Sequence, residues 1–363
     1  IKLAKKKTEK FSSFLNNPID FTLVITILLL LGIGLVMVLS ASSPSALAIT
    51  GDSYKYFNKQ LLFAVLGVIA MMAISKIDYR FYQKFYKHAW WIALILLALV
   101  LIAGRTVNGA KRWIFVTETL SFQPSEVVKI LMIIFYAGIL VKNRDELGLY
   151  TKGFIKNMCL LAPIIGLLLL EPHFSASIVI IGICATMMIM AGCKFWHFLA
   201  TGAVAGIPAM ILLIVKEPYR LQRVITFLDP WKDATGDGWQ VIQSLYAIGS
   251  GGLFGVGLGE SKQKFLYIPE PHNDFIFSIL GEELGFIGCA VVLILFAIFI
   301  WRGVLIAMKA PDMFGSLIAI GITALVAIQV IINVAVVTSS MPATGMPLPF
   351  FSYRRNSIIY FIV

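Results

Sequence analysis

The residues in this chain that could do chemistry gather in a few segments of its 363 residues. One segment, PEPHNDF (269–275), stands directly before a long apolar stretch. A carboxylate beside apolar walls can have its pKa raised toward neutrality, which suits a general base. Asp274 is therefore a candidate catalytic base. The alternative, which this segment alone favours, is that Asn273 or Asp274 only caps the helix that follows.

A second segment, NGAKRWI (108–114), places two cations next to each other. Together, Lys111 and Arg112 could hold a phosphate or diphosphate group. Trp113 beside them is a residue type that favours the membrane interface. The alternative is that both cations only extend to lipid headgroups. The residues alone favour neither interpretation over the other.

Carboxylates inside apolar stretches are the third candidate group. Glu126 and Lys129 are three residues apart on an expected helix, so they can form a structural ion pair. Glu282 and Glu283 lie about two helical turns beyond Asp274, and at about 100° per residue they point in different directions. Because charge is costly within the membrane, at least one of these two glutamates must find a partner inside the protein.

Two further segments look like connections with a defined shape. MPATGMPLPFFSY (341–353) contains three prolines and a glycine, which predicts a stiff loop suited to a lid or substrate wall. The alternative is an ordinary link between helices. Residues 171–173, Glu-Pro-His, predict a tight turn. The glycine run 249–259 lacks the GK[ST] ending of a nucleotide phosphate loop, so it indicates close packing or a hinge.

The elements that position these groups are membrane helices. The chain is 59% hydrophobic and 13% charged, and its mean hydropathy is +0.88. Apolar runs of about 20 residues match the thickness of a bilayer. We therefore expect an all-α integral membrane protein, one polytopic domain over 1–363 with nine full spans and a truncated tenth from Ser357. The nine spans are predicted near 20–41, 58–75, 89–103, 126–141, 157–170, 174–191, 196–215, 274–301 and 314–338.

The distribution of Lys and Arg predicts the orientation of these spans. The segments that lie inside when the N-terminus is cytoplasmic are short and richer in Lys and Arg, as the positive-inside rule requires. The net charge of +11 then reports topology and not nucleic-acid binding. A large loop, about 216–273, lies outside. Its glycine-rich part, 239–259, predicts a re-entrant or interfacial helix.

No cysteine or histidine pattern predicts a metal site. The four cysteines fall in or beside apolar segments without CxxC spacing, and the four histidines are scattered.

These segments together resemble the SEDS family of peptidoglycan glycosyltransferases, which includes FtsW, RodA and SpoVE, and most closely the FtsW/SpoVE branch. The matching stretches are NGAKRWI (108–114), FQPSE (122–126), EPHFSAS (171–177), the long segment 238–288 and MPATGMPLPFFSY (341–353). The resemblance implies ten spans with a large extracytoplasmic loop between spans seven and eight. It also implies polymerisation of lipid II into glycan strands, in division or sporulation, with undecaprenyl diphosphate as the leaving group.

The resemblance assigns roles to the candidate residues. Asp274 matches the family's essential aspartate and would act as the base, while Lys111 and Arg112 would stabilise the charge developing on the diphosphate. The other residues expected at the substrate are Trp113, Arg220, Arg223, Lys262, Lys264, His272 and Ser352. No cofactor is evident, although a divalent cation such as Mg²⁺ or Mn²⁺ could help carry the leaving group.

The family implies a class B penicillin-binding protein as partner, together with other division or sporulation membrane proteins. Two alternative functions stay open, a lipid II flippase and a non-catalytic scaffold for that partner. One departure from the family bears on activity. Arg354 and Arg355 stand where the family usually has two glycines, and only a few apolar residues follow, which predicts an absent or partial tenth span.

Overall fold

The computed structural model describes residues 19–353, except 108–109, 116–120, 237, 266 and 269–270. Within these residues, nine helical stretches are long and apolar enough to cross a membrane, which confirms the nine predicted spans. The segment from Ser357, where the tenth span is predicted, lies outside the described residues. The spans are α2 (Phe21–Thr50), α3 (Lys55–Ile74), α5 (Tyr86–Ala103), α6 (Pro124–Lys142), η2 with α7 (Tyr150–Leu170), α8 (Phe174–Ala191), α9 to α10 (Phe195–Val215), α13 (Ile276–Lys309) and α14 (Met313–Val337).

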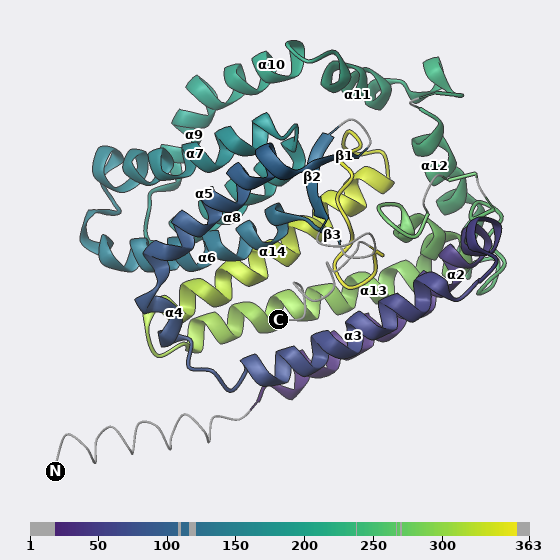
Figure 1. The fold of residues 1–363 in the computed structure, drawn as a ribbon, viewed down its shortest axis with the longest axis horizontal. Helices are drawn as coiled ribbons and strands as arrows, with labels where there is room; N and C mark the ends of the chain where they lie inside the picture. The colour runs from purple at the N-terminus through teal and green to yellow at the C-terminus, as the bar shows by residue number, and fades with distance from the viewer. Residues whose placement is uncertain are drawn as a thin grey trace.

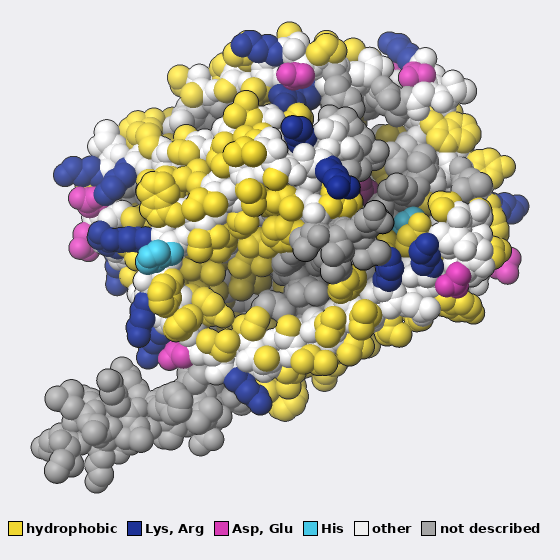
Figure 2. Space-filling model, viewed as in Figure 1, with side chains coloured by type: hydrophobic (Ala, Val, Ile, Leu, Met, Phe, Trp, Pro, Cys, Tyr) yellow, Lys and Arg dark blue, Asp and Glu magenta, His cyan; other side chains and the backbone are white. Residues whose placement is uncertain are grey.

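Two helices form the centre of the bundle. About two thirds of the apolar windows of α6 and α14 are buried, whereas the span from α9 to α10 is not buried at all. Figure 1 accordingly shows α14 crossing the middle of the molecule, with α13, α2 and α3 on one side and α9 and α10 along the opposite edge. In Figure 2, hydrophobic side chains cover the middle of the visible face and charged ones lie mainly along its margins. Such a surface suits a lipid bilayer, because in water these hydrophobic side chains would form a large exposed apolar patch.

Short elements fill the connections between the spans. They are α4 (Arg80–Lys84) and η1 (Arg144–Glu146), and, between α10 and α13, α11 (Pro218–Leu228), η4 (Pro230–Asp233) and α12 (Trp239–Gly251). We call the end of the bundle where α13 begins and α14 ends the site end. The segment with α11 and α12 lies there, because it joins the last residue of α10 to the first of α13.

The connection between α5 and α6 is a small sheet, which the sequence analysis did not predict. Strands β1 (Arg105–Val107), β2 (Ala110–Phe115) and β3 (Ser121–Phe122) pair antiparallel in the order β1-β2-β3. The sequence signal for it exists. β-Branched and aromatic residues flank Asn-Gly, the dipeptide most typical of a two-residue hairpin turn.

Helix α13 is longer than predicted and is kinked. Its 34 residues include Gly285, which has a φ of 66° and a ψ of −165°, far from helical values. Only glycine adopts this conformation readily. The kink lets the glycine-rich segment after α12 lie against α13, where Phe286 N–H donates to the Gly252 carbonyl at 2.9 Å. Gly251 and Gly255 serve close packing, because a side chain on either would collide with the backbone of α13, whereas Gly252 and Gly259 have open space beside them and a positive φ.

Candidate functional site

Asp274 stands in a turn before α13 and does not cap the helix. The capping position belongs to Phe275, and no side chain makes a capping hydrogen bond there. The cap interpretation of Asp274 is therefore wrong, because the helix begins after residues 271–275 have formed a tight turn. Asp274 is partly exposed as a residue, although its carboxylate oxygen Oδ1 is buried.

Asn333, deep in α14, positions this turn. Its side-chain amide donates to the Asp274 carbonyl at 2.9 Å and to the Met346 carbonyl at 2.8 Å. Asn333 is only 1% exposed. One amide group thus ties the aspartate to the proline-rich loop 341–353. The sequence analysis missed Asn333, although a buried asparagine within an apolar span is a recognisable signal.

The proline-rich loop 341–353 lies directly against Asp274. A side chain placed on Gly345 would come within 3.3 Å of an Asp274 carboxylate oxygen, and Gly345 has a φ of 65°. The loop is held by several elements, since Ser175 Oγ donates to the Thr344 carbonyl at 2.6 Å and Phe350 stacks on Phe296 of α13. The loop forms one wall beside the carboxylate.

The expected substrate contacts of His272 and Ser352 are replaced by contacts within the protein. The His272 ring stacks on Tyr56 at 4.8 Å and meets Tyr353 at 5.7 Å. Burial lowers the pKa of His272 to about 4, so the ring is neutral near pH 7 and brings no charge to a phosphate. The Ser352 hydroxyl accepts from the Leu348 N–H at 2.8 Å and closes a turn. Both residues shape the loop behind Asp274.

Lys111, Arg112 and Trp113 lie on β2. Thr106 of β1 pairs with Lys111 and Arg105 pairs with Trp113, so Arg112 is the extra residue of a bulge, where the alternation of side chains between the two faces of the sheet is interrupted. The interpretation of Lys111 and Arg112 as an adjacent pair that holds a phosphate stays a prediction. Lys111 is exposed, whereas Arg112 donates to the Pro172 carbonyl at the turn before α8. Trp113 is half-buried beside them.

Three of the four loop cations lie near loop surfaces, and two of these three donate to carbonyl groups. Arg220 donates to the Leu213 carbonyl at 3.0 Å and lies over the Phe174 ring, and Arg223 donates to the Ala343 carbonyl. Lys262 is exposed. These three cations remain near the loop surfaces of the site end, where they can meet an anionic headgroup.

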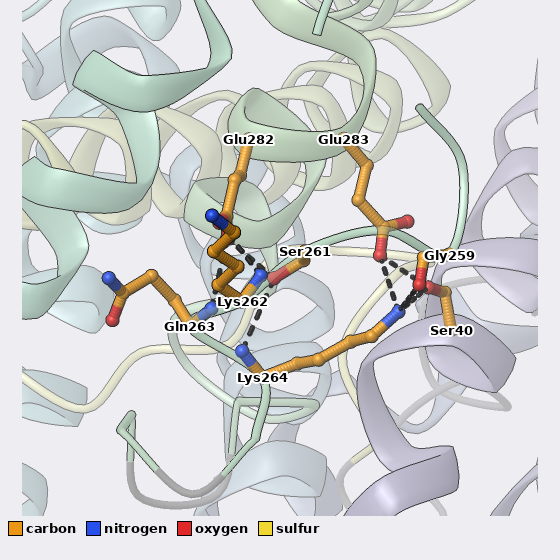
Figure 3. A network of polar contacts seen from close by, with 8 residues as sticks. All are labelled: Ser40, Gly259, Ser261, Lys262, Gln263, Lys264, Glu282 and Glu283. Atoms are coloured by element: carbon orange, nitrogen blue, oxygen red, sulfur yellow. Dashed lines mark hydrogen bonds and ion pairs between the residues drawn. The ribbon is translucent and has the colours of Figure 1, made fainter. Parts of the chain in front are cut away.

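Lys264 is buried, and its ammonium group lies at the centre of the network drawn in Figure 3. It pairs with Glu283 at 2.9 Å and donates to Ser40 Oγ at 3.1 Å and to the Gly259 carbonyl. Ser40 in turn donates to Glu283 at 2.5 Å. This placement corrects the expectation that Lys264 binds substrate, because an ammonium group that is 4% exposed and paired cannot reach a headgroup.

Glu282 holds the other half of this network. Its carboxylate accepts from the Ser261 hydroxyl, from the Lys262 N–H at 2.9 Å and from the Gln263 N–H at 3.4 Å. Both glutamates thus have partners inside the protein, whereas the sequence analysis predicted a partner for at least one of them. Together they fasten the loop 259–264 to α13.

A second buried polar cluster lies where α6 and α8 begin. Glu126 and Lys129 form an ion pair at 2.7 Å with side chains 4% and 1% exposed. Gln123 and His173 have side-chain nitrogens 3.5 Å apart. Burial raises the pKa of Glu171 to about 8, although the positive charge of Arg112 lowers it in part. The charge of Arg112 links this cluster to β2 through Glu171.

Among the described residues, no group of three or more His, Cys, Asp or Glu side chains could hold a metal ion.

Comparison with known proteins places the chain in a family. The family model described as "Cell cycle protein" (FtsW, RodA, SpoVE) matches residues 21–363. The chain belongs to this family. Stage V sporulation protein E of Bacillus subtilis is 44% identical over 93% of both chains. A probable peptidoglycan glycosyltransferase FtsW of Trichlorobacter lovleyi is 42% identical over 94% of this chain and 89% of its own.

Solved structures of FtsW/RodA/SpoVE type share the fold. A chain from a study titled "Structural coordination of polymerization and crosslinking by a peptidoglycan synthase complex" matches 94% of both chains with a TM-score of 0.77 and 29% identity. Rod shape determining protein RodA of Thermus thermophilus matches 94% of this chain and 93% of its own with a TM-score of 0.70 and 26% identity.

Proposed function

We propose that this chain is a peptidoglycan glycosyltransferase that polymerises lipid II and releases undecaprenyl diphosphate. Its family membership supports this, as do relatives of about 40% identity that carry this enzymatic name. The observation that carries the proposal is the placement of Asp274. Asp274 is a partly exposed residue whose carboxylate lies beside Gly345 of the proline-rich loop, and its backbone carbonyl is held by Asn333.

The reaction needs a base and a site for the anion that leaves. The 4-hydroxyl of the acceptor sugar attacks the anomeric carbon of the donor, and Asp274 accepts the hydroxyl proton. The bond between that carbon and the lipid diphosphate breaks, and the diphosphate leaves with the bonding electrons. Exposed Lys111 and Lys262 are the cations that could stabilise the developing charge, and Arg112 and Arg220 could assist from the same end.

We propose that the site end faces outward, with the N-terminus cytoplasmic, because Lys and Arg are denser in the opposite connections. A divalent cation, if one takes part, would be brought by the substrate diphosphate. The deep carboxylates Glu126, Glu282 and Glu283 are engaged in ion pairs or hydrogen bonds with protein groups, which favours an enzyme over a flippase.

The experiment that tests this function is polymerisation of purified lipid II by the detergent-solubilised chain, comparing wild type with Asp274→Asn. Wild type should make glycan, and the variant should be slower by about 10²–10⁴-fold, the usual contribution of a general base. Glu260→Gln, which neutralises an exposed carboxylate of the same loop region, is the matched control and should behave as wild type. Equal rates for Asp274→Asn and wild type would refute the role of Asp274.

We further propose a class B penicillin-binding protein as partner, because a structural neighbour is described as part of a peptidoglycan synthase complex. Co-purification of the two proteins from membranes, and faster polymerisation in the complex than by the chain alone, would support this. A stable fold with no association in either assay would contradict it.

A further inference from the structure

A cavity of about 200 Å³ lies at the site end, beside the proline-rich loop. Three elements form it. Arg223, Thr226 and Phe227 share one face of α11, since they are three or four residues apart, and Gln240 and Val241 open α12. The residues after α14 close it. The Ser244 hydroxyl of α12 donates to the Val337 carbonyl at 2.8 Å, which fixes two of these walls together.

Thr226 gives a separate indication that the cavity receives a ligand. The threonine is 7% exposed, and its buried hydroxyl oxygen has no hydrogen-bond partner among the described residues. A buried hydroxyl without a partner costs about 1–3 kcal/mol, so such groups are normally satisfied. Thr226 forms part of the cavity wall, so rotation of its side chain about χ1 would bring the enclosed hydroxyl to a polar group that occupies the cavity.

The polar residues around the cavity are donors. Besides Thr226, the polar lining residues are Arg223, Gln240 and Ser339, and the lining contains no carboxylate. A guanidinium beside hydroxyl and amide groups matches a carboxylate, which accepts from several donors at once. The remaining walls include Phe227, Val241 and Met341, which suit the apolar part of a small residue.

The size of the cavity limits what can enter. Sites for complete drug-sized ligands measure about 300–1,000 Å³, so about 200 Å³ takes only part of a ligand. Ala343 lines the cavity, and Gly345 lies against the Asp274 carboxylate. Two residues of chain span at most about 7 Å. One headgroup can therefore reach both places.

We propose that this cavity is a subsite for the carboxylate end of the peptide carried by the lipid-linked substrate. The inference rests on the proposed function, since that function supplies a substrate with such a peptide. The subsite would hold the headgroup at one end while its sugar lies at Asp274, and it would distinguish substrates by their peptide and not by their lipid.

The test is binding of the peptide N-acetyl-Lys-D-Ala-D-Ala to the purified full chain in detergent, followed by saturation-transfer NMR. The free acid should bind at least about tenfold more tightly than its C-terminal amide, since the amide loses a charge-assisted hydrogen bond. Arg223→Gln should weaken binding of the free acid by a similar factor and remove the difference in affinity between the acid and the amide.

Two further variants keep the test independent of folding. Thr226→Val, which keeps the side-chain shape, should weaken binding severalfold while the melting temperature stays at or above that of wild type. Lys232→Gln removes the same charge from an exposed residue of the same loop and should bind the acid as wild type does.

Three results would overturn the subsite: no binding of the acid to wild type, equal affinity of acid and amide, or unchanged affinity in both Arg223→Gln and Thr226→Val. Displacement of the peptide by an equal concentration of inorganic phosphate would also overturn it, because the cavity would then be a phosphate site.

Polymerisation assays on the same samples separate the proposed subsite from the proposed function. Glycan synthesis without peptide binding would refute only the subsite, and peptide binding without glycan synthesis would refute only the proposed function.

Discussion

Asp274 and the pair Glu282–Glu283 lie within ten residues of each other, yet the structure places them in opposite circumstances. Asp274 is partly exposed before α13 begins, with its backbone carbonyl held by Asn333. The two glutamates are 2% and 1% exposed, and their carboxylates bind Lys264 and the loop 259–264. An accessible carboxylate can take a proton from a substrate. A buried, paired carboxylate holds two segments together.

The comparison shows that the surroundings of a carboxylate decide its role: Asp274 stands in the turn before α13, and the two glutamates lie buried within α13. Buried ion pairs need hydrogen bonds to offset their desolvation, and the network of Figure 3 supplies most of them from Ser40, Ser261 and backbone groups, while Glu283 Oε2 has no partner among the described residues. Such a network contributes to shape rather than to turnover. The predictions below separate these two roles.

The largest expected effect on stability comes from Glu283→Ala. Removing the carboxylate leaves the ammonium group of Lys264 buried without its counter-charge, which typically costs about 3–5 kcal/mol. The melting temperature of the purified protein in detergent should fall strongly, and yield should fall with it. The double variant Lys264→Met/Glu283→Leu, which removes both charges, should recover most of the loss. A Glu283→Ala protein as stable as wild type would show that the pair has no structural role.

Asn333→Leu should reduce the polymerisation rate more than it reduces stability. Two buried carbonyl groups lose their donor, and a displacement of Asp274 by about 1 Å can cost about 10²-fold in rate. The measurement is kcat against KM for lipid II, and the loss should fall mainly on kcat.

Gln329→Leu is the matched control for Asn333→Leu. Gln329 is a fully buried amide one turn earlier on α14, and neither its nitrogen nor its oxygen has a hydrogen-bond partner among the described residues. Its replacement by leucine should leave the rate unchanged and the stability equal or higher. Equal kinetic losses in both variants would mean that Asn333 acts through packing and not through Asp274.

The last prediction concerns pH, and its effect is spread over several pH units. The folded-state pKa of Glu171 is about 8, raised by burial from an ordinary value of 4.5. The folded state therefore binds a proton that the unfolded state releases, so this contribution to stability is complete below about pH 4.5 and is lost as pH rises to about 8. Each pH unit in that window costs at most about 1.4 kcal/mol. Glu171→Gln should flatten the fall of melting temperature between pH 5 and 8, whereas Glu260→Gln should not. An identical slope in wild type and Glu171→Gln would rule out this titration.

The sequence predicts the fold well because apolar runs of bilayer length dominate it. All nine spans lie where hydropathy places them, since length and composition decide whether a helix can cross a membrane. The small sheet between α5 and α6 was missed because its strands have only two to six residues. The bulge at Arg112 depends on the pairing of β2 with β1, which the spacing of Lys111 and Arg112 does not reveal.

The candidate site is less predictable, since it depends on contacts between distant segments. Asp274 could be singled out, but Asn333 lies 59 residues further along the chain and only the fold brings them together. In the sequence, Lys264 resembles a surface cation. In the structure, the kink at Gly285 and the glycine-rich segment place it against Glu283. Charge alone does not reveal which cations become buried.

The most direct test of this account measures the polymerisation rate, lipid II binding and melting temperature of Asp274→Asn on one preparation. We expect a rate lower by at least about 10²-fold, with binding and melting temperature close to those of wild type. That result would separate Asp274 from the structural glutamates. A normal rate, or a fall in melting temperature as large as that of Glu283→Ala, would contradict the assignment of Asp274 as the base.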